Sequence, residues 1–249
     1  MIYGKAILFF RPSTYNERYT LISDPVSPST YALAIHTASP DFGLAIDNFQ
    51  GDRRQQTWEL GRDLSTHLHL YLQEFLQPQT WQDLSFLAVA KGPGGFTGTR
   101  LGVVTARTIA QQLNLPLFAI STLAAIAWTK RSTSSSEPPD LAVQMPAQRG
   151  ELYTAIYGIT ESNLPLSPRS SLPASPQLEL LPLLPDTVMS PDRWQQILAS
   201  WHRPYQVVPV EGNLGGTAAA LLDLAALDWQ QGIRPPWSEA VPFYGQSPV

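Results

Sequence analysis

The chain has 249 residues, of which 43% are hydrophobic, 14% are charged, 23 are proline and none is cysteine, and its formal net charge is −4. Without cysteine the chain has no disulfide, no thiolate zinc site and no cysteine nucleophile. Proteins that hold a nucleic acid backbone alone usually have a basic excess, which this chain lacks, so we expect that a partner does much of any RNA binding.

The first strands and the first helix are predicted from the change in hydrophobic period. Residues 1–30 show little periodicity, and we expect a flexible extension or a start codon assigned too early. Apolar runs at 31–35 and 42–46 flank a Ser-Pro-Asp turn and predict antiparallel strands, with a candidate third strand at 55–58. Leucine and aromatic residues at helical spacing then predict a helix over 60–76.

The rest of the chain alternates strand and helix patterns. The region 162–185 is rich in proline and is predicted to be loop with at most short strands, because proline removes donors from a sheet. The other predicted elements are strands at 85–90, 116–120, 141–145, 151–157 and 207–210, and helices to 113 and at 122–130, 191–201 and 217–231. Three antiparallel strands followed by a parallel strand–helix unit are typical of a ribonuclease-H-like α/β arrangement.

Two kinds of segment are not predicted. The apolar run at 6–10 is shorter than the 7–15 apolar residues of a signal peptide and the about 20 of a membrane helix, so we expect a cytoplasmic protein. We find no internal sequence repeat.

The most informative segment is the glycine-rich stretch at 91–107, between a predicted strand and a predicted helix. Such loops often bind phosphate through backbone amides. A P-loop requires Gly-Lys-Ser/Thr, however, and Gly98 is followed by Thr99. A dinucleotide fingerprint that starts at Gly92 requires glycine at position 97, which is Thr97. A nucleotide site is therefore the less favoured interpretation.

The helix after this loop carries small residues at every fourth position, namely Gly98, Gly102, Ala106 and Ala110. They form one ridge that another backbone can approach closely. One interpretation is that the ridge packs on the chain's own sheet. The other is that it contacts a helix of another chain, assisted by the helix at 60–76. The second interpretation predicts that a large side chain at Gly102 or Ala106 blocks partner binding and leaves the monomer folded.

The sequence offers no persuasive catalytic set. His67 and His69 point about 200° apart on a helix and do not share a metal. His36 stands alone at a strand end, and the acidic residues Asp41, Asp63, Glu74 and Glu151 are scattered without a reason to pair.

The glycine motif resembles the hallmark of the bacterial TsaB (YeaZ) family, GPGSFTGxRxG. Four further segments resemble that family: LAIHTA at 33–38, ISTL at 120–123, RGELY at 149–153, and the helix at 221–231 with the end at 239–244. The resemblance covers about 31–244. It implies an actin-like ATPase (ASKHA, ribonuclease-H-like) fold with two subdomains. The division that we expect is 1–30 as extension, 31–113 plus 212–232 as the first subdomain, 114–211 as the second and 233–249 as a tail.

The resemblance also implies a role in forming N6-threonylcarbamoyladenosine in tRNA, as a non-catalytic subunit with no cofactor and no metal. The implied partners are a TsaD-type transferase and a TsaE-type ATPase, with tRNA reached only through the complex and no membrane contact. The implied partner-binding residues lie on two helices and the loop between them: Leu64, His67, Leu68, Tyr71, Gly94, Phe96, Thr97, Gly98, Arg100, Leu101, Gly102, Thr105, Ala106 and Ile109.

Several positions depart from the family pattern. Active members of the fold carry aspartate after the first strand, where this chain has His36, a poor magnesium ligand. Pro146 and Gln148 replace an acid and an arginine, and the tail after Tyr244 lacks the usual leucine-arginine. Two alternatives stay open. One is an autonomous metallopeptidase-like or phosphotransferase enzyme, and the other is a homodimer formed through the same helices.

Overall fold

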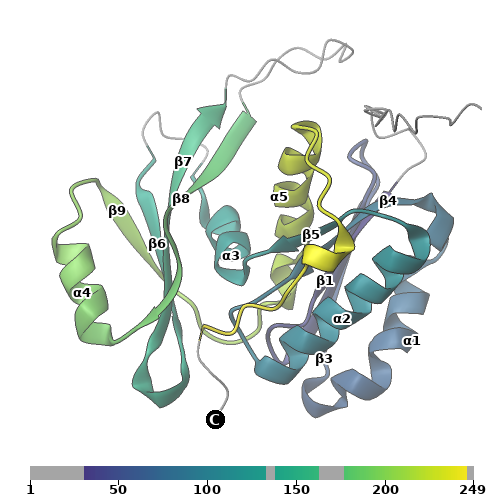
Figure 1. Cartoon of the computed structure of the whole chain (residues 1–249), viewed down its shortest axis with the longest axis horizontal. Coiled ribbons are helices and arrows are strands. Elements are labelled where there is room, and N and C mark those ends of the chain that lie inside the picture. Colours follow the sequence, from purple (N-terminus) through teal and green to yellow (C-terminus); the bar gives the residue numbers. More distant parts are fainter. Residues whose placement is uncertain (1–30, 133–137, 163–176, 246–249) are drawn as a thin grey trace, which may run out of the picture.

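The computed structural model describes residues 31–132, 138–162 and 177–245. The extension expected at 1–30 lies outside these residues. The described chain forms two β-sheets, each with helices packed on it, and α3 (Thr122–Lys130) lies between them (Figure 1). None of the described helices is long and apolar enough to span a lipid bilayer.

The first sheet has the strand order β3-β2-β1-β4-β5. Its strands are β1 (Tyr31–His36), β2 (Asp41–Asp47), β3 (Arg53–Glu59), β4 (Leu84–Ala90) and β5 (Leu117–Ile120). β1, β2 and β3 pair antiparallel, whereas β4 is parallel to both β1 and β5. This topology confirms the predicted ribonuclease-H-like arrangement.

Helices cover both faces of the first sheet. This arrangement is needed because β1, β2 and β4 carry apolar side chains on both faces of the sheet, and these side chains are buried. α1 (Leu64–Leu76) and α2 (Phe96–Leu113) pack on one face over Leu33, Ile35 and Val89. α5 (Ala218–Gln230) and one side of α3 pack on the other face, over small residues of β1 and β4. α1 begins at Leu64, later than predicted, because residues 61–63 form a 3-10 turn.

The second sheet has the order β8-β7-β6-β9, formed by β6 (Asp140–Pro146), β7 (Leu152–Ser162), β8 (Gln177–Met189) and β9 (Tyr205–Pro209). β6, β7 and β8 pair antiparallel and β9 pairs parallel to β6, so the strand pattern of the first sheet recurs without sequence repetition. α4 (Pro191–Ala199) covers one face through Trp194, and α3 covers the other. Ser190 caps the N-terminus of α4, since its Oγ accepts from Arg193 N at 3.3 Å.

The prediction of loop over 162–185 is wrong for its second part, because β8 is a 13-residue strand that begins at Gln177. β8 lies at the edge of its sheet and pairs only with β7, so one side of the strand needs no donors. Pro182 pairs with Tyr157, and the register shifts between Thr154 and Tyr157, opposite Pro185. Edge positions and bulges are where a sheet tolerates proline.

Candidate functional site

The glycine loop between β4 and α2 lies against the turn that follows β1. Gly95 N donates to Ala38 O at 2.7 Å, and Gly92 O accepts from Thr122 N at 2.8 Å. A Cβ at Gly94 would overlap the carbonyl oxygen of Ala38, so the loop needs glycine there to approach this closely. The glycines of the motif therefore serve backbone packing inside this chain.

The small-residue ridge of α2 also packs inside the chain. A Cβ at Gly98 would come closer than 3.0 Å to the carbonyl oxygen of Thr37, and one at Gly102 would overlap Thr37 Oγ1. Ala106 and Ala110 are fully buried over the first sheet. The interpretation that the ridge packs on the chain's own sheet thus holds in the structure. The expectation that a large side chain at Gly102 or Ala106 leaves the monomer folded is wrong, because no room exists beside β1.

The expected partner-binding residues fall into groups that differ in exposure. Five are buried in the described chain: Leu64, Leu68, Gly102, Thr105 and Ala106. Six are half-buried: His67, Tyr71, Gly94, Gly98, Leu101 and Ile109. Phe96, Thr97 and Arg100 are exposed, and all three lie in the first two turns of α2. The buried residues hold α1 and α2 on the sheet, whereas the exposed ones are available to another molecule.

Two apolar side chains on the outer side of these helices are absent from the expected partner-binding residues. Leu70 of α1 is 51% exposed and Val104 of α2 is 58% exposed. Leu70 follows the half-buried His67 by three positions, and Val104 follows the exposed Arg100 by four. Each pair therefore lies on one side of its helix. The signal that could have indicated them is an apolar residue at a helix position outside the stripe that packs on the sheet. Figure 1 shows α1 and α2 at one side of the molecule, with the yellow segment that contains Trp237 lying along part of α2.

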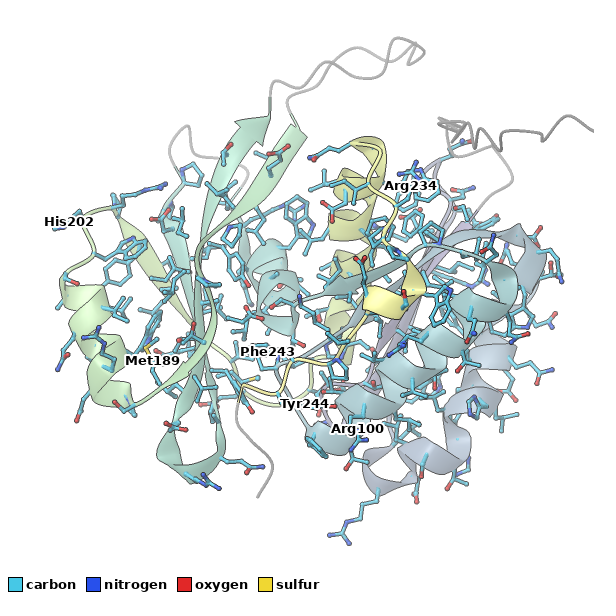
Figure 2. All side chains as sticks on the ribbon, viewed as in Figure 1. Arg100, Met189, His202, Arg234, Phe243 and Tyr244 are labelled. Atoms are coloured by element: carbon cyan, nitrogen blue, oxygen red, sulfur yellow. The ribbon has the colours of Figure 1, made fainter. Side chains whose placement is uncertain are left out.

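The first turn of α2 contacts the C-terminal part of the chain. The rings of Phe96 and Tyr244 lie 4.9 Å apart between centroids, and the Arg100 guanidinium lies 5.2 Å from the Phe96 ring centroid. Figure 2 shows Phe243, Tyr244 and Arg100 following one another from the region between the sheets to the start of α2. Cation–π and aromatic contacts of this kind favour a fixed arrangement of the three side chains.

A cleft of about 850 Å³ lies between the two halves of the described chain. The β1–β2 turn and the first turn of α2 line one side, and the β6–β7 turn with Tyr153 lines the other. Thr99 also lines the cleft, and its buried hydroxyl has no hydrogen-bond partner among the described residues. The wall includes the tail residues Phe243 and Tyr244.

His36 lies at the end of β1 and is fully buried, and neither ring nitrogen has a hydrogen-bond partner within the described part of the chain. Burial lowers the pKa of His36 from its ordinary value of 6.5 to about 4, and the nearby Asp41 carboxylate opposes this shift. The neutral ring is therefore the form that the fold accommodates at neutral pH.

The buried ring predicts a pH dependence of stability. The pKa of His36 in the folded chain lies below its unfolded value. The contribution of the neutral ring to the free energy of unfolding is therefore fully present above pH 6.5 and is lost as the pH falls from 6.5 to about 4. The loss from this one group should reach about 3 kcal/mol. Urea unfolding of the wild type and of His36→Leu at pH 7 and pH 4.5 checks this, and equal losses in both proteins would contradict it.

The described residues contain no group of three or more His, Asp and Glu side chains that could hold a metal ion. His67 and His69, which we expected to diverge, differ in exposure, with His69 exposed and His67 half-buried beside the Tyr71 ring.

Comparison with protein families and curated sequences gives matches within residues 62–167 and over short segments. The family model described as TsaD, tRNA N6-adenosine threonylcarbamoyltransferase, matches residues 62–167. A Bacillus subtilis protein named tRNA threonylcarbamoyladenosine biosynthesis protein TsaB is 40% identical over 88 residues, which are 34% of this chain and 37% of the relative. The protein of the same name from Escherichia coli is 33% identical over 85 residues, 33% of this chain and 35% of the relative. The matched segments thus span little more than a third of either relative.

Solved structures resemble the chain over a larger part of its length. YeaZ from Pseudomonas aeruginosa has a TM-score of 0.64 at 21% identity, and covers 86% of this chain and 99% of its own. A protein described as similar to the peptidase YeaZ from that organism has a TM-score of 0.65 at 19% identity, and covers 87% of this chain and 100% of its own. These likenesses show a shared fold. The curated relatives named TsaB agree with the family that the glycine motif of this chain resembles.

Proposed function

We propose that this chain is a non-catalytic subunit in the formation of N6-threonylcarbamoyladenosine in tRNA, and that it binds a TsaD-type transferase through the outer sides of α1 and α2. The observation that carries this proposal is the exposure of Leu70 and Val104 on the outer sides of α1 and α2, together with the partly exposed Phe96 at the start of α2. Curated relatives named for threonylcarbamoyladenosine biosynthesis support the pathway. The surface belongs to the first subdomain of the predicted division.

The shape of this surface suits contact with another helical face. Leu64, Leu68 and Leu72 of α1 and Val103 of α2 anchor both helices on the sheet. The outer surface of the two helices is therefore held in place before a partner arrives, and little conformational entropy is lost on binding. Exposed apolar residues rimmed by Arg100 and His67 match the usual composition of an interface, an apolar centre with a polar edge.

The proposal predicts that Val104→Glu weakens binding of the TsaD-type partner at least tenfold, because a carboxylate would lose water at the centre of the contact. The fold should be unchanged, since Val104 is 58% exposed. Titration of the labelled partner by fluorescence or calorimetry measures the change. Leu181→Glu is the matched control, because Leu181 is 49% exposed but lies on β8 of the second sheet.

Equal affinity of the wild type and Val104→Glu for the partner would overturn the proposed surface. A reconstituted reaction with the transferase and a TsaE-type ATPase tests the pathway itself, and the modified nucleoside should fall strongly when this chain is omitted. Light scattering with and without the transferase separates the heterodimer from a homodimer, since a second copy would use the same helices. Tight binding of ATP with magnesium to the isolated chain would favour the enzyme alternative.

A further inference from the structure

The last described residues cross from the first sheet to the second. Pro235 O accepts from Leu117 N of β5 at 3.2 Å, and Ala240 is buried in the core under α1 and α2. The chain then runs as Val241–Gly245 along the end of β4, where Phe243 N donates to Lys91 O at 2.6 Å. Figure 1 shows this segment in yellow, leaving the first sheet toward the second.

The last three of these residues, Phe243, Tyr244 and Gly245, contact the second sheet. The Phe243 ring packs against the core formed by α3, β6 and β7. Tyr153 of β7 donates its hydroxyl hydrogen to Tyr244 O at 3.3 Å. A Cβ at Gly245 would lie 2.5 Å from Val188 Cγ2 of β8 and 3.0 Å from Tyr153 Cε1, so the backbone lies directly on β7 and β8. Val241–Gly245 is therefore joined to both sheets by backbone and side-chain contacts.

Two glycines fit this crossing. A Cβ at Gly92 would lie 2.6 Å from Phe243 O, and the left-handed φ of +100° there also favours glycine. Gly245 has a φ of +63° and lies against Val188. The crossing segment also forms part of the cleft wall through Phe243 and Tyr244, with lining residues from each sheet on either side.

We propose that Val241–Gly245 is a latch that sets the separation of the two halves and thereby the width of the cleft. Elsewhere in the described chain the two halves also meet through the packing of α3 between the sheets. Leu178 and Leu180 of β8 pack against the core that contains α5, and Gln231 Nε2 donates to Glu179 Oε1 at 3.1 Å. The latch adds a further contact between the two halves, near the C-terminal end of the described residues. It holds Tyr244 against Phe96, so the start of α2 is fixed by the same segment.

The test is the distance between the halves, measured in the full chain by electron–electron double resonance. The chain has no cysteine, so Gln56→Cys on β3 and Gln195→Cys on α4 place labels at two exposed positions without further changes. The pair Phe243→Ala with Tyr244→Ala should lengthen the mean distance by more than about 2 Å, or broaden the distribution, as hinge motions do. Tyr153→Phe should shift it in the same direction by less.

Val241→Ala is the control and should leave the distribution unchanged, because the Val241 side chain is 58% exposed. A folded double variant with the wild-type distribution would overturn the latch. If the double variant does not fold, Tyr153→Phe decides, and an unchanged distribution in that variant would overturn the latch as well. No partner is present in this measurement, so its failure would leave the proposed function standing.

Discussion

Replacement of Asp41 by alanine is expected to lower the free energy of unfolding by about 3 kcal/mol, because several donors would lose their acceptor in the interior. The Asp41 carboxylate is 1% exposed and accepts from Leu214 N at 3.0 Å, Gly215 N at 2.7 Å and Ser39 Oγ. These bonds fix the segment that returns from the second sheet to α5. Without them the Gly215 amide would be buried and unpaired, and the Leu214 amide would keep only Ser39 Oγ, at 3.0 Å, as an acceptor.

Urea unfolding followed by circular dichroism measures this loss. Asp41→Asn keeps one carbonyl acceptor and should lose less than the alanine variant. Asp63→Ala is the control, because Asp63 is exposed and makes no side-chain cap for α1, so its effect should stay within about 0.5 kcal/mol. Similar losses for Asp41→Ala and Asp63→Ala would contradict the role given to the buried carboxylate.

Gly98→Ala is expected to destabilise the chain by about 2 kcal/mol, even though alanine favours a helix over glycine by about 1 kcal/mol. The added methyl group would overlap the carbonyl oxygen of Thr37, which is backbone and has little room to move. Thr37 Oγ1 also donates to Gly98 O at 2.8 Å, so a shift of α2 away from β1 would break this bond.

The same unfolding measurement applies, with Gly216→Ala as the matched control. A Cβ at Gly216 would meet nothing within 4 Å, so that change should be neutral or slightly stabilising. If Gly98→Ala were as stable as the wild type while partner binding was lost, the ridge would be a contact surface after all. The structure instead directs interface variants to Val104, where added bulk or charge meets solvent.

Local patterns predicted most strands and helices, because each was marked by a regular hydrophobic period. The positions of β1, β2, β4 and α5 follow directly from apolar runs that end at turn residues. The strand at Gln177–Met189 was not predicted as a long strand, because its prolines indicate a loop unless the strand is known to lie at the edge of its sheet. Edge and central positions cannot be distinguished before the strand order is known.

The candidate site was predicted only in part, for a different physical reason. The motif located α2, but a helix with small residues on one side does not show whether that side meets its own sheet or another chain. The backbone amides that donate to Asp41 lie more than 170 positions away in the sequence, so no local pattern reveals them. The contact of Phe96 with Tyr244 also joins residues that lie far apart along the chain.

The edges of the two sheets limit how this chain can associate. At β8, Pro182 and Pro185 offer no backbone donors, and at β3, Arg53 and Arg54 place charge along the strand. At β5, the edge amide of Leu117 is already occupied by Pro235 O. Such features disfavour β-augmentation and edge-to-edge aggregation. With these three edges protected, the helical faces and the remaining edge strand, β9, are the surfaces left for contact with another protein.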